Sequence, residues 1–284
     1  MGSAGQDQGA ASLWDIATPS RRGRLPGVSM AGFRARTTDA VDLGVVPYPA
    51  VTVALELGDG ALAVEDADGR RQSGGAVVGL ASVGVRGRGR DIECLQVRLS
   101  PSVAHAVLGG GCAEPGAGVV SLEDLWGREA VRLQERLRAA GSWEARFALA
   151  EAALLGRYEA GPAVDPEVAF VWGRTAASHG AVRVERLADE AGWSRKRLWS
   201  RFRSQLGITP KRAAQLVRFD HAAHRLAAGH GAARVAAETG YTDQSHLYRD
   251  VKAFAGVTPT AVAAAPWLAV DDVAWAADGH RAES

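Results

Sequence analysis

Two segments of the C-terminal third share one pattern, and this repetition constrains the fold more than any other feature of the sequence. Gly192–Pro210 reads GWSRKRLWSRFRSQLGITP, and Gly240–Pro259 reads GYTDQSHLYRDVKAFAGVTP. Aligned on Leu198 and Leu247, both follow L-x3-[FV]-x4-G-[IV]-T-P. The spacing from the first glycine to the leucine differs by one residue, so we treat only the leucine, the second glycine and the Thr-Pro pair as equivalent.

Each repeated segment is typical of one short amphipathic helix. Thr242 or Asp243 can cap the second helix, and Ser194 the first, because a short side-chain oxygen accepts hydrogen bonds from free backbone N–H groups. Gly256 ends the second helix, and Pro259 prevents its continuation. The outer face is polar and cationic, as a helix in the DNA major groove requires. The apolar residues of the other face recur at spacings of four and three: Leu247, Val251 and Phe254.

The sequence around the repeat predicts an all-helical domain. The alternative interpretation is two ordinary core helices with basic outer faces. The matching glycine and Thr-Pro positions instead favour two copies of one DNA-binding helical unit. The stretch 161–166, with two prolines and a glycine, is the expected domain boundary. The helix order predicts two helix-turn-helix units joined by one longer helix. Besides the repeated segments, helices are expected at 166–179, 184–192, 211–229 and 232–240.

The N-terminal half has the pattern of short strands. Apolar or alternating runs are separated by glycine-rich turns, which predicts a small β-barrel or sandwich. Its interior could hold a small ligand or only side chains. We expect residues 1–25 to be a flexible N-terminus and the Gly/Arg run 84–91 to be an exposed turn. The expected strands are 50–57, 61–66, 76–85 and 92–100.

Helices are expected between the strands and the domain boundary. The segments 101–109, 121–141 and 143–158 have helical patterns, and Ser121 with Asp124 has the spacing of a capping box. These helices either pack against the strands or form a dimer interface. The C-terminal tail 265–284 is acidic and apolar, and its pattern predicts no particular role.

Charge and composition restrict the function. The net charge is only +1, but residues 180–264 contain 14 Lys and Arg against 7 Asp and Glu, which favours a polyanion partner such as nucleic acid. Cys94 and Cys112 form no zinc spacing, and no histidine precedes His105, so neither a metal site nor a Ser/His/Asp site is expected in the strands. No signal peptide or membrane-spanning run is evident, and a cytoplasmic protein is expected.

At these residues the chain resembles the AraC/XylS family of bacterial transcription regulators. The resemblance covers 166–264, and its strongest carriers are LADEAGWSRKRLWSRFRSQLGITPKR and VAAETGYTDQSHLYRDVKAFAGVTP. Val251 stands where the family often has Phe, and Ala213 and Ala214 where it has an aromatic residue, which affects core packing. Residues 26–160 are similar, less specifically, to the sensing or dimerisation domains of such regulators. The implied fold class is α+β, with an N-terminal small β-barrel or sandwich and a C-terminal double helix-turn-helix domain.

The resemblance also implies which side chains contact DNA. Arginine can bridge two acceptors on guanine, and glutamine can pair with adenine. Trp199 can contact a thymine methyl group or simply pack on its neighbours, and Arg203 is expected on phosphate. His246 is expected to be a neutral hydrogen-bonding group. The remaining expected base-contacting residues are Arg195, Lys196, Ser200, Gln244, Ser245, Tyr248 and Arg249.

The expected function is that of a sequence-specific DNA-binding transcription regulator, controlled by a small ligand or by dimerisation through the N-terminal domain. We expect no enzymatic activity, cofactor or metal, because two lone cysteines cannot supply the cluster of a zinc-cysteine DNA-repair methyltransferase. A ligand-independent regulator and a non-specific architectural protein remain as alternatives. Double-stranded DNA is the expected partner, while RNA polymerase, a small-molecule effector and a second copy of the chain remain open.

Overall fold

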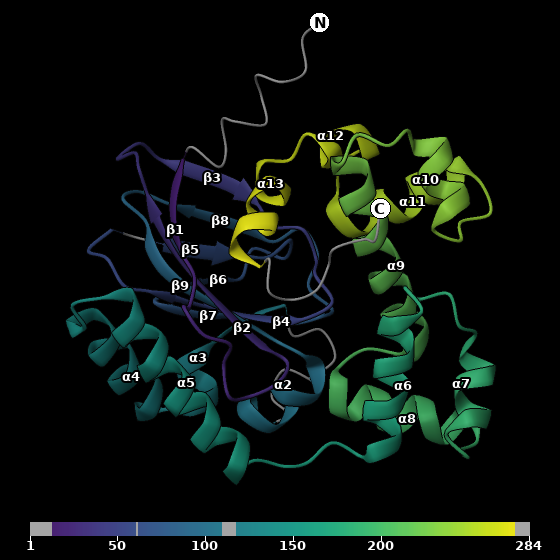
Figure 1. The fold of residues 1–284 in the computed structure, drawn as a ribbon, viewed down its shortest axis with the longest axis horizontal. Helices are drawn as coiled ribbons and strands as arrows, with labels where there is room; N and C mark the ends of the chain where they lie inside the picture. Colours follow the sequence, from purple (N-terminus) through teal and green to yellow (C-terminus); the bar gives the residue numbers. More distant parts are fainter. Residues whose placement is uncertain (1–12, 61, 110–117, 276–284) are drawn as a thin grey trace, which may run out of the picture.

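A computed structural model describes residues 13–60, 62–109 and 118–275. The chain combines an N-terminal half of antiparallel sheets and helices with a C-terminal half made only of helices (Figure 1). The predicted α+β class is confirmed. The two sheets do not close into a barrel; they face each other across a shared cavity, as in the sandwich alternative.

All strand pairs of both sheets are antiparallel. The larger sheet has the order β1(Trp14–Ala17), β2(Val28–Ala35), β9(Glu93–Leu99), β4(Val51–Glu56), β7(Gly75–Val78), β10(Val119–Ser121). The smaller sheet has the order β3(Val41–Gly44), β8(Arg86–Gly89), β5(Leu62–Glu65), β6(Arg71–Ser73).

The central strands β4 and β9 separate the hydrophobic core from the cavity. Val53 lies opposite Val97, and both side chains are buried in the main core. Because successive side chains of a strand point to opposite faces, the neighbouring positions point the other way. Thr52 pairs with Arg98, and these two side chains line the space between the sheets. Alternation along two strands therefore places one buried arginine in a mostly apolar cavity.

The N-terminal half differs from expectation in several places; the strand expected at 76–85, for example, ends at Val78 in β7. The run 84–91, expected as an exposed turn, contains strand β8, because the alternating Arg86 and Arg88 meet carboxylates on both neighbouring strands. Arg86 donates to Asp42 at 2.9 Å, and Arg88 donates to Glu65 at 3.1 Å. Within the expected flexible N-terminus, Trp14–Ala17 forms the edge strand β1, while residues 1–12 lie outside the described part.

Helices cover the larger sheet. The single helix expected at 121–141 divides at Gly127, whose φ of 58° and ψ of −137° interrupt the helical path. Ser121 caps the first part, but it accepts its hydrogen bond from the backbone of Glu123 and not from Asp124, the partner expected in a capping box. A Cβ at Gly32 would lie 2.4 Å from the ring of Trp143, so this glycine lets the helix approach the sheet. The helices of this half are α2(Pro101–Leu108), α3(Leu122–Trp126), α4(Arg128–Ala139) and α5(Trp143–Ala160).

The C-terminal half contains the helices that the sequence predicts, and further helices at 259–263 and 266–274 that were not expected. Its long helix α9(Pro210–Ala227) buries Leu216, Phe219, Ala223 and Leu226, which confirms the expected apolar side. The other helices are α6(Pro166–Ala177), α7(Val184–Glu190), α8(Arg195–Leu206), α10(Ala232–Glu238), α11(Gln244–Ala255), α12(Pro259–Ala263) and α13(Pro266–Ala274). Among the described residues, none of these helices has both the length and the apolar character needed to cross a bilayer.

Candidate nucleic-acid interface

Two helix-turn-helix units lie at the two ends of α9, which connects them (Figure 1). The first consists of α7 and α8, and the second of α10 and α11. The second helix of each unit has 12 residues and buries the repeated leucine, Leu198 in α8 and Leu247 in α11. The repeat found in the sequence is therefore a repeat of structure.

The two second helices begin and end with the same kinds of contact. Ser194 accepts a hydrogen bond from the backbone N of Arg197 at 3.3 Å, and Asp243 accepts one from His246 at 2.7 Å. These caps satisfy N–H groups that a helix start leaves free. Each helix ends at a left-handed glycine, with φ of 77° and 72° respectively, which suits a residue without a Cβ. The ending glycines are Gly207 and Gly256.

The Thr-Pro pairs after both glycines have one local role. Thr209 accepts a hydrogen bond from the backbone of Arg212, and Thr258 accepts one from Ala261, each at 3.2 Å. The following proline stands at the first helical position, where its missing N–H costs no hydrogen bond. Thr-Pro is thus the start signal of α9 in one unit and of α12 in the other.

The second segment has one residue more than the first between its first glycine and its leucine, and this residue lies in the turn before α11. In α8 the leucine is the fourth residue after the Ser194 cap, and in α11 it is the fourth after the Asp243 cap. Thr242 therefore lengthens the turn without displacing the helix. The sequences alone support the alignment of the two segments only from the leucine onward. In the structure α8 and α11 are equivalent over their whole length.

This register pairs an aromatic residue of each turn with a helical residue. Arg197 lies over the ring of Trp193, with its guanidinium carbon 4.4 Å from the ring centroid. At the equivalent place, the rings of His246 and Tyr241 pack at right angles, with centroids 5.1 Å apart. Both turn aromatics are buried, so these contacts fix the start of each helix against its turn. Position three of each helix therefore has a packing role.

The expected DNA-contacting side chains lie mainly on the outer faces. In α8 all five are exposed, although Arg195 also lies 3.9 Å from Glu185. In α11 four are exposed and His246 is half-buried. Arg249 makes a long 3.4 Å contact with the backbone oxygen of Ser245. The exposed residues are Arg195, Lys196, Trp199, Ser200 and Arg203 in α8, and Gln244, Ser245, Tyr248 and Arg249 in α11.

An open hollow joins the two units across α9. It is lined by the start of α8, by His246 of α11 and by the turn before α7. Lys211 and Gln215 of α9 and Arg183 of the turn also line it, and none of them is among the DNA-contacting residues expected from the sequence. Their signal in the sequence is weak, because basic residues on a connecting helix are also typical of ordinary solvated surface.

The second helix of each unit forms an ion pair with a neighbouring element. The pairing residue stands at the same position of both helices, Arg201 in α8 and Asp250 in α11. In α8, Arg201 donates to both carboxylate oxygens of Asp165, at 2.6 and 2.8 Å. These bonds, against the opposing effect of burial, lower the pKa of Asp165 to about 2. In α11 the charge is reversed, since Asp250 lies 3.8 Å from Arg218 of α9.

A family model described as a helix-turn-helix domain matches residues 187–265, which include both units. This is a helix-turn-helix domain of the AraC type. The AraC-type domain makes the chain a DNA-binding transcription regulator. No curated protein sequence matches the chain.

Several solved structures are similar to this chain over part of their length. ToxT from Vibrio cholerae O395 has 11% sequence identity and a TM-score of 0.47, with 84% of this chain and 98% of that chain covered. The C-terminal domain of AraT, a response regulator from Geobacillus stearothermophilus, has 21% identity and a TM-score of 0.33, with 35% and 85% covered. The AraC-like transcriptional activator CuxR has 19% identity and a TM-score of 0.28, with 71% and 84% covered. The family match, and not these overall likenesses, assigns the AraC-type domain.

The AraC-type domain accommodates small residues where aromatic ones were expected. Ala213, Ala214 and Val251 are all buried. A Cβ at Gly180 would lie 2.1 Å from the backbone oxygen of Ala214, so the turn after α6 approaches α9 very closely here. This close approach of two backbones requires glycine at position 180.

Proposed function

We propose that the chain is a sequence-specific regulator whose AraC-type domain, residues 166–264, reads two successive major-groove segments of one DNA face. The observation that carries this proposal is the equivalence of α8 and α11 from cap to ending glycine. Two helices of this kind on one rigid connection suit groove segments one turn apart, about 34 Å. Double-stranded DNA in the cytoplasm is the proposed partner.

The outer residues have distinct proposed roles. Arg195 and Arg249 can bridge the two major-groove acceptors of guanine, and Gln244 can pair with adenine. Lys196, Ser200 and Ser245 add hydrogen bonds to bases or phosphates, and His246 adds one while it packs on Tyr241. Arg203 stands towards the end of α8 and is proposed to contact phosphate. Trp199 and Tyr248 offer exposed rings for apolar contact with the thymine methyl group.

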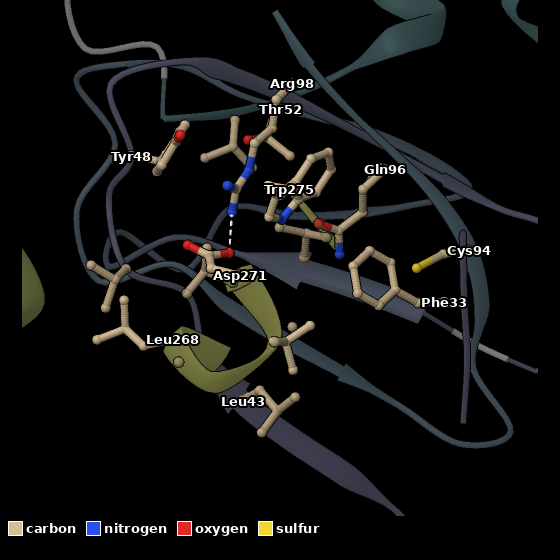
Figure 2. A pocket seen from close by; sticks show the side chains of 18 of the residues that line it. Phe33, Leu43, Tyr48, Thr52, Cys94, Gln96, Arg98, Leu268, Asp271 and Trp275 are labelled. Atoms are coloured by element: carbon tan, nitrogen blue, oxygen red, sulfur yellow. Dashed lines mark hydrogen bonds and ion pairs between the residues drawn. The ribbon is translucent and has the colours of Figure 1, made fainter. Parts of the chain in front are cut away.

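We further propose that residues 26–160 sense a small molecule in the cavity between the sheets. The cavity measures about 170 Å³, and its walls come from both sheets and α13 (Figure 2) and from α9. The lining is largely apolar, with Phe33, Leu43 and Val78 among its residues. The Nη1 atom of Arg98 is buried there and makes no hydrogen bond to the described residues. An apolar molecule with one acceptor oxygen fits this combination.

Selection of binding sites from random DNA tests the proposed reading. We expect recovered sites to share two short elements about one helical turn apart. Competition with random-sequence DNA then separates a specific reader from an architectural protein, because the latter shows no preference for the recovered site. Recovery of no common site, with equal competition by random DNA, would contradict the proposal.

Thermal unfolding of the full chain tests the proposed sensing. A small apolar acid or ketone that occupies the cavity should raise the melting temperature, because it binds only the folded state. A matched Thr52→Trp variant, which fills the cavity from β4, should lose that shift. A shift that survives in this variant would place the ligand elsewhere, and a ligand-independent regulator would show no shift with any compound of this class.

A further inference from the structure

Helix α13 begins at Pro266, directly after the matched domain ends at residue 265. The helix leaves the DNA-binding units and returns to the N-terminal sheets, where Figure 1 shows it in yellow beside the strands. Trp275, just after the helix, contacts Phe33 of β2 with ring centroids 6.4 Å apart. Val270, Ala274 and Trp275 complete one hydrophobic cluster with Ala31, Phe33, Ile92 and Cys94.

A buried ion pair ties α13 to the larger sheet. The Nη2 atom of Arg98 donates to Asp271 at 2.7 Å, and the two side chains are only 13% and 11% exposed. The guanidinium lies between the rings of Tyr48 and Trp275, with centroids 3.9 and 4.1 Å from its central carbon. Figure 2 shows the Asp271 carboxylate directed at Arg98 from the α13 ribbon. Hydrogen bonding in the guanidinium plane and stacking above and below it fix this geometry.

The other oxygen of the same carboxylate faces α9. Nε2 of His224 lies 3.4 Å from Oδ2 of Asp271, and Nδ1 lies 2.9 Å from the backbone oxygen of Asp220. Both ring nitrogens thus face acceptor oxygens, which favours the imidazolium with two N–H groups. Burial opposes this charge, but the Asp271 and Asp220 oxygens raise the pKa of His224 to about 9. His224 is therefore positively charged at neutral pH.

We infer that α13 is a latch that ties α9 to the N-terminal sheet through Asp271, which pairs with Arg98 on one side and His224 on the other. The latch consists of residues 266–275. Leu268, Val270 and Asp271 of α13 form part of the cavity wall, and so do Asp220, Ala223 and His224 of α9. A change in the cavity therefore acts on the contact between α13 and α9 itself. An effect of the latch on DNA binding rests on the proposed function, in which α9 sets the spacing between the DNA-contacting helices α8 and α11.

Hydrogen–deuterium exchange of the full chain tests the latch without DNA or ligand. Asp271→Asn keeps the shape of the side chain and removes its charge. We expect amide exchange to become about tenfold faster or more in α13 and in the C-terminal half of α9, since breaking a buried pair strands a charge. Helix α4, on the far side of the sheets, should keep its wild-type rate. Val273→Ala is the matched control, because Val273 lies on α13 and is 53% exposed.

A second variant separates the latch from general destabilisation. His224→Gln should break only the contact to α9, so exchange should rise in α9 while α13 stays protected on the sheet. The inference is overturned if Asp271→Asn leaves α9 at its wild-type rate, or if His224→Gln changes neither helix. It is also overturned if both variants accelerate α4 as much as α9. A failure to find specific DNA would affect the proposed function alone, because none of these readouts involves DNA.

Discussion

Trp199 and Tyr248 occupy the same position, the fifth residue, of two equivalent helices. Their side chains are 40% and 46% exposed, although large aromatic residues usually gain stability by burial. Neither ring is needed to fill the core, since Leu198 and Leu247 beside them are fully buried. Two exposed rings at one equivalent place on the outer faces are better explained by contact with a partner than by folding.

Trp199→Ala and Tyr248→Ala should therefore weaken binding to a selected DNA site while folding stays intact. We expect each change in unfolding free energy to remain within about 0.5 kcal/mol, the usual range for exposed positions. Fluorescence anisotropy and thermal unfolding measure the two effects. Phe254→Ala is the contrasting variant, because this ring is buried against Phe219 and its loss should cost about 3–5 kcal/mol. Equal losses of stability and of binding in Trp199→Ala would favour a packing role.

Arg249→Ala should lower affinity for the selected site by about 1–3 kcal/mol and relax the preference at one base position. The reason is that an arginine on the outer face of α11 can hydrogen-bond two acceptors of one guanine. Repeated site selection with the variant measures both effects. Arg71→Ala, an exposed arginine of β6 in the other half, is the matched control and should change neither. An unchanged selected site would show that Arg249 does not read bases.

Arg203→Ala should weaken binding to all DNA sequences alike. A phosphate contact releases counterions, so the slope of log affinity against log salt should fall by about 1. Titrations at several salt concentrations, with the selected site and with random DNA, provide the measurement. If the loss were confined to the selected site, Arg203 would belong among the base-reading residues.

Gly256→Ala and Gly173→Ala should change stability in opposite directions. Gly256 ends α11 with φ of 72°, and no atom would crowd a new Cβ, so backbone strain alone should cost about 1–2 kcal/mol. Gly173 lies exposed within α6 and also has free space, so alanine there should stabilise by about 0.5–1 kcal/mol. Denaturant unfolding compares the two. A neutral Gly256→Ala would mean that the end of α11 adapts without strain.

Asp165→Asn should lower the melting temperature at neutral pH but leave it unchanged at a pH below the folded pKa of Asp165. The pKa of Asp165 is about 2 in the folded protein and about 3.9 in an unfolded chain, because Arg201 holds the charged form. A carboxyl with a lowered folded pKa stabilises above the unfolded value and loses this effect as pH falls through the folded value. The difference between wild type and variant should thus be constant above about pH 5, decrease as the pH falls and vanish only towards about pH 1, below both pKa values. A difference independent of pH would contradict the ion-pair explanation.

The C-terminal half was predictable because its signals are local. Caps, ending glycines and Thr-Pro starts act within a few residues, so Gly256 and Thr209 predict their own helix boundaries. Strand β8 was missed because Arg86 and Arg88 become strand residues only when Asp42 and Glu65 lie beside them. Periodicity within a short Gly/Arg run carries no information about such distant partners.

The candidate DNA interface also has features that follow from local sequence and features that depend on distant residues. The outer faces of α8 and α11 follow from the buried positions of each helix, since a helix that buries Leu247 must expose Tyr248. The placement of Thr242 in the turn and the anchoring of Arg201 on Asp165 needed coordinates. The role of the tail could not be predicted, because Asp271 meets Arg98 across 173 residues of sequence.

The contact between Trp275 and Phe33 has a consequence for biosynthesis. The N-terminal sheet emerges first from the ribosome, and domains generally fold in that order. Here, however, the hydrophobic cluster around Phe33 also needs Val270 and Ala274, which come much later in the sequence. The nascent N-terminal half must therefore keep an apolar surface uncovered until residues 266–275 have been translated. A fragment that stops before residue 266 would keep this surface permanently exposed and would be prone to aggregate.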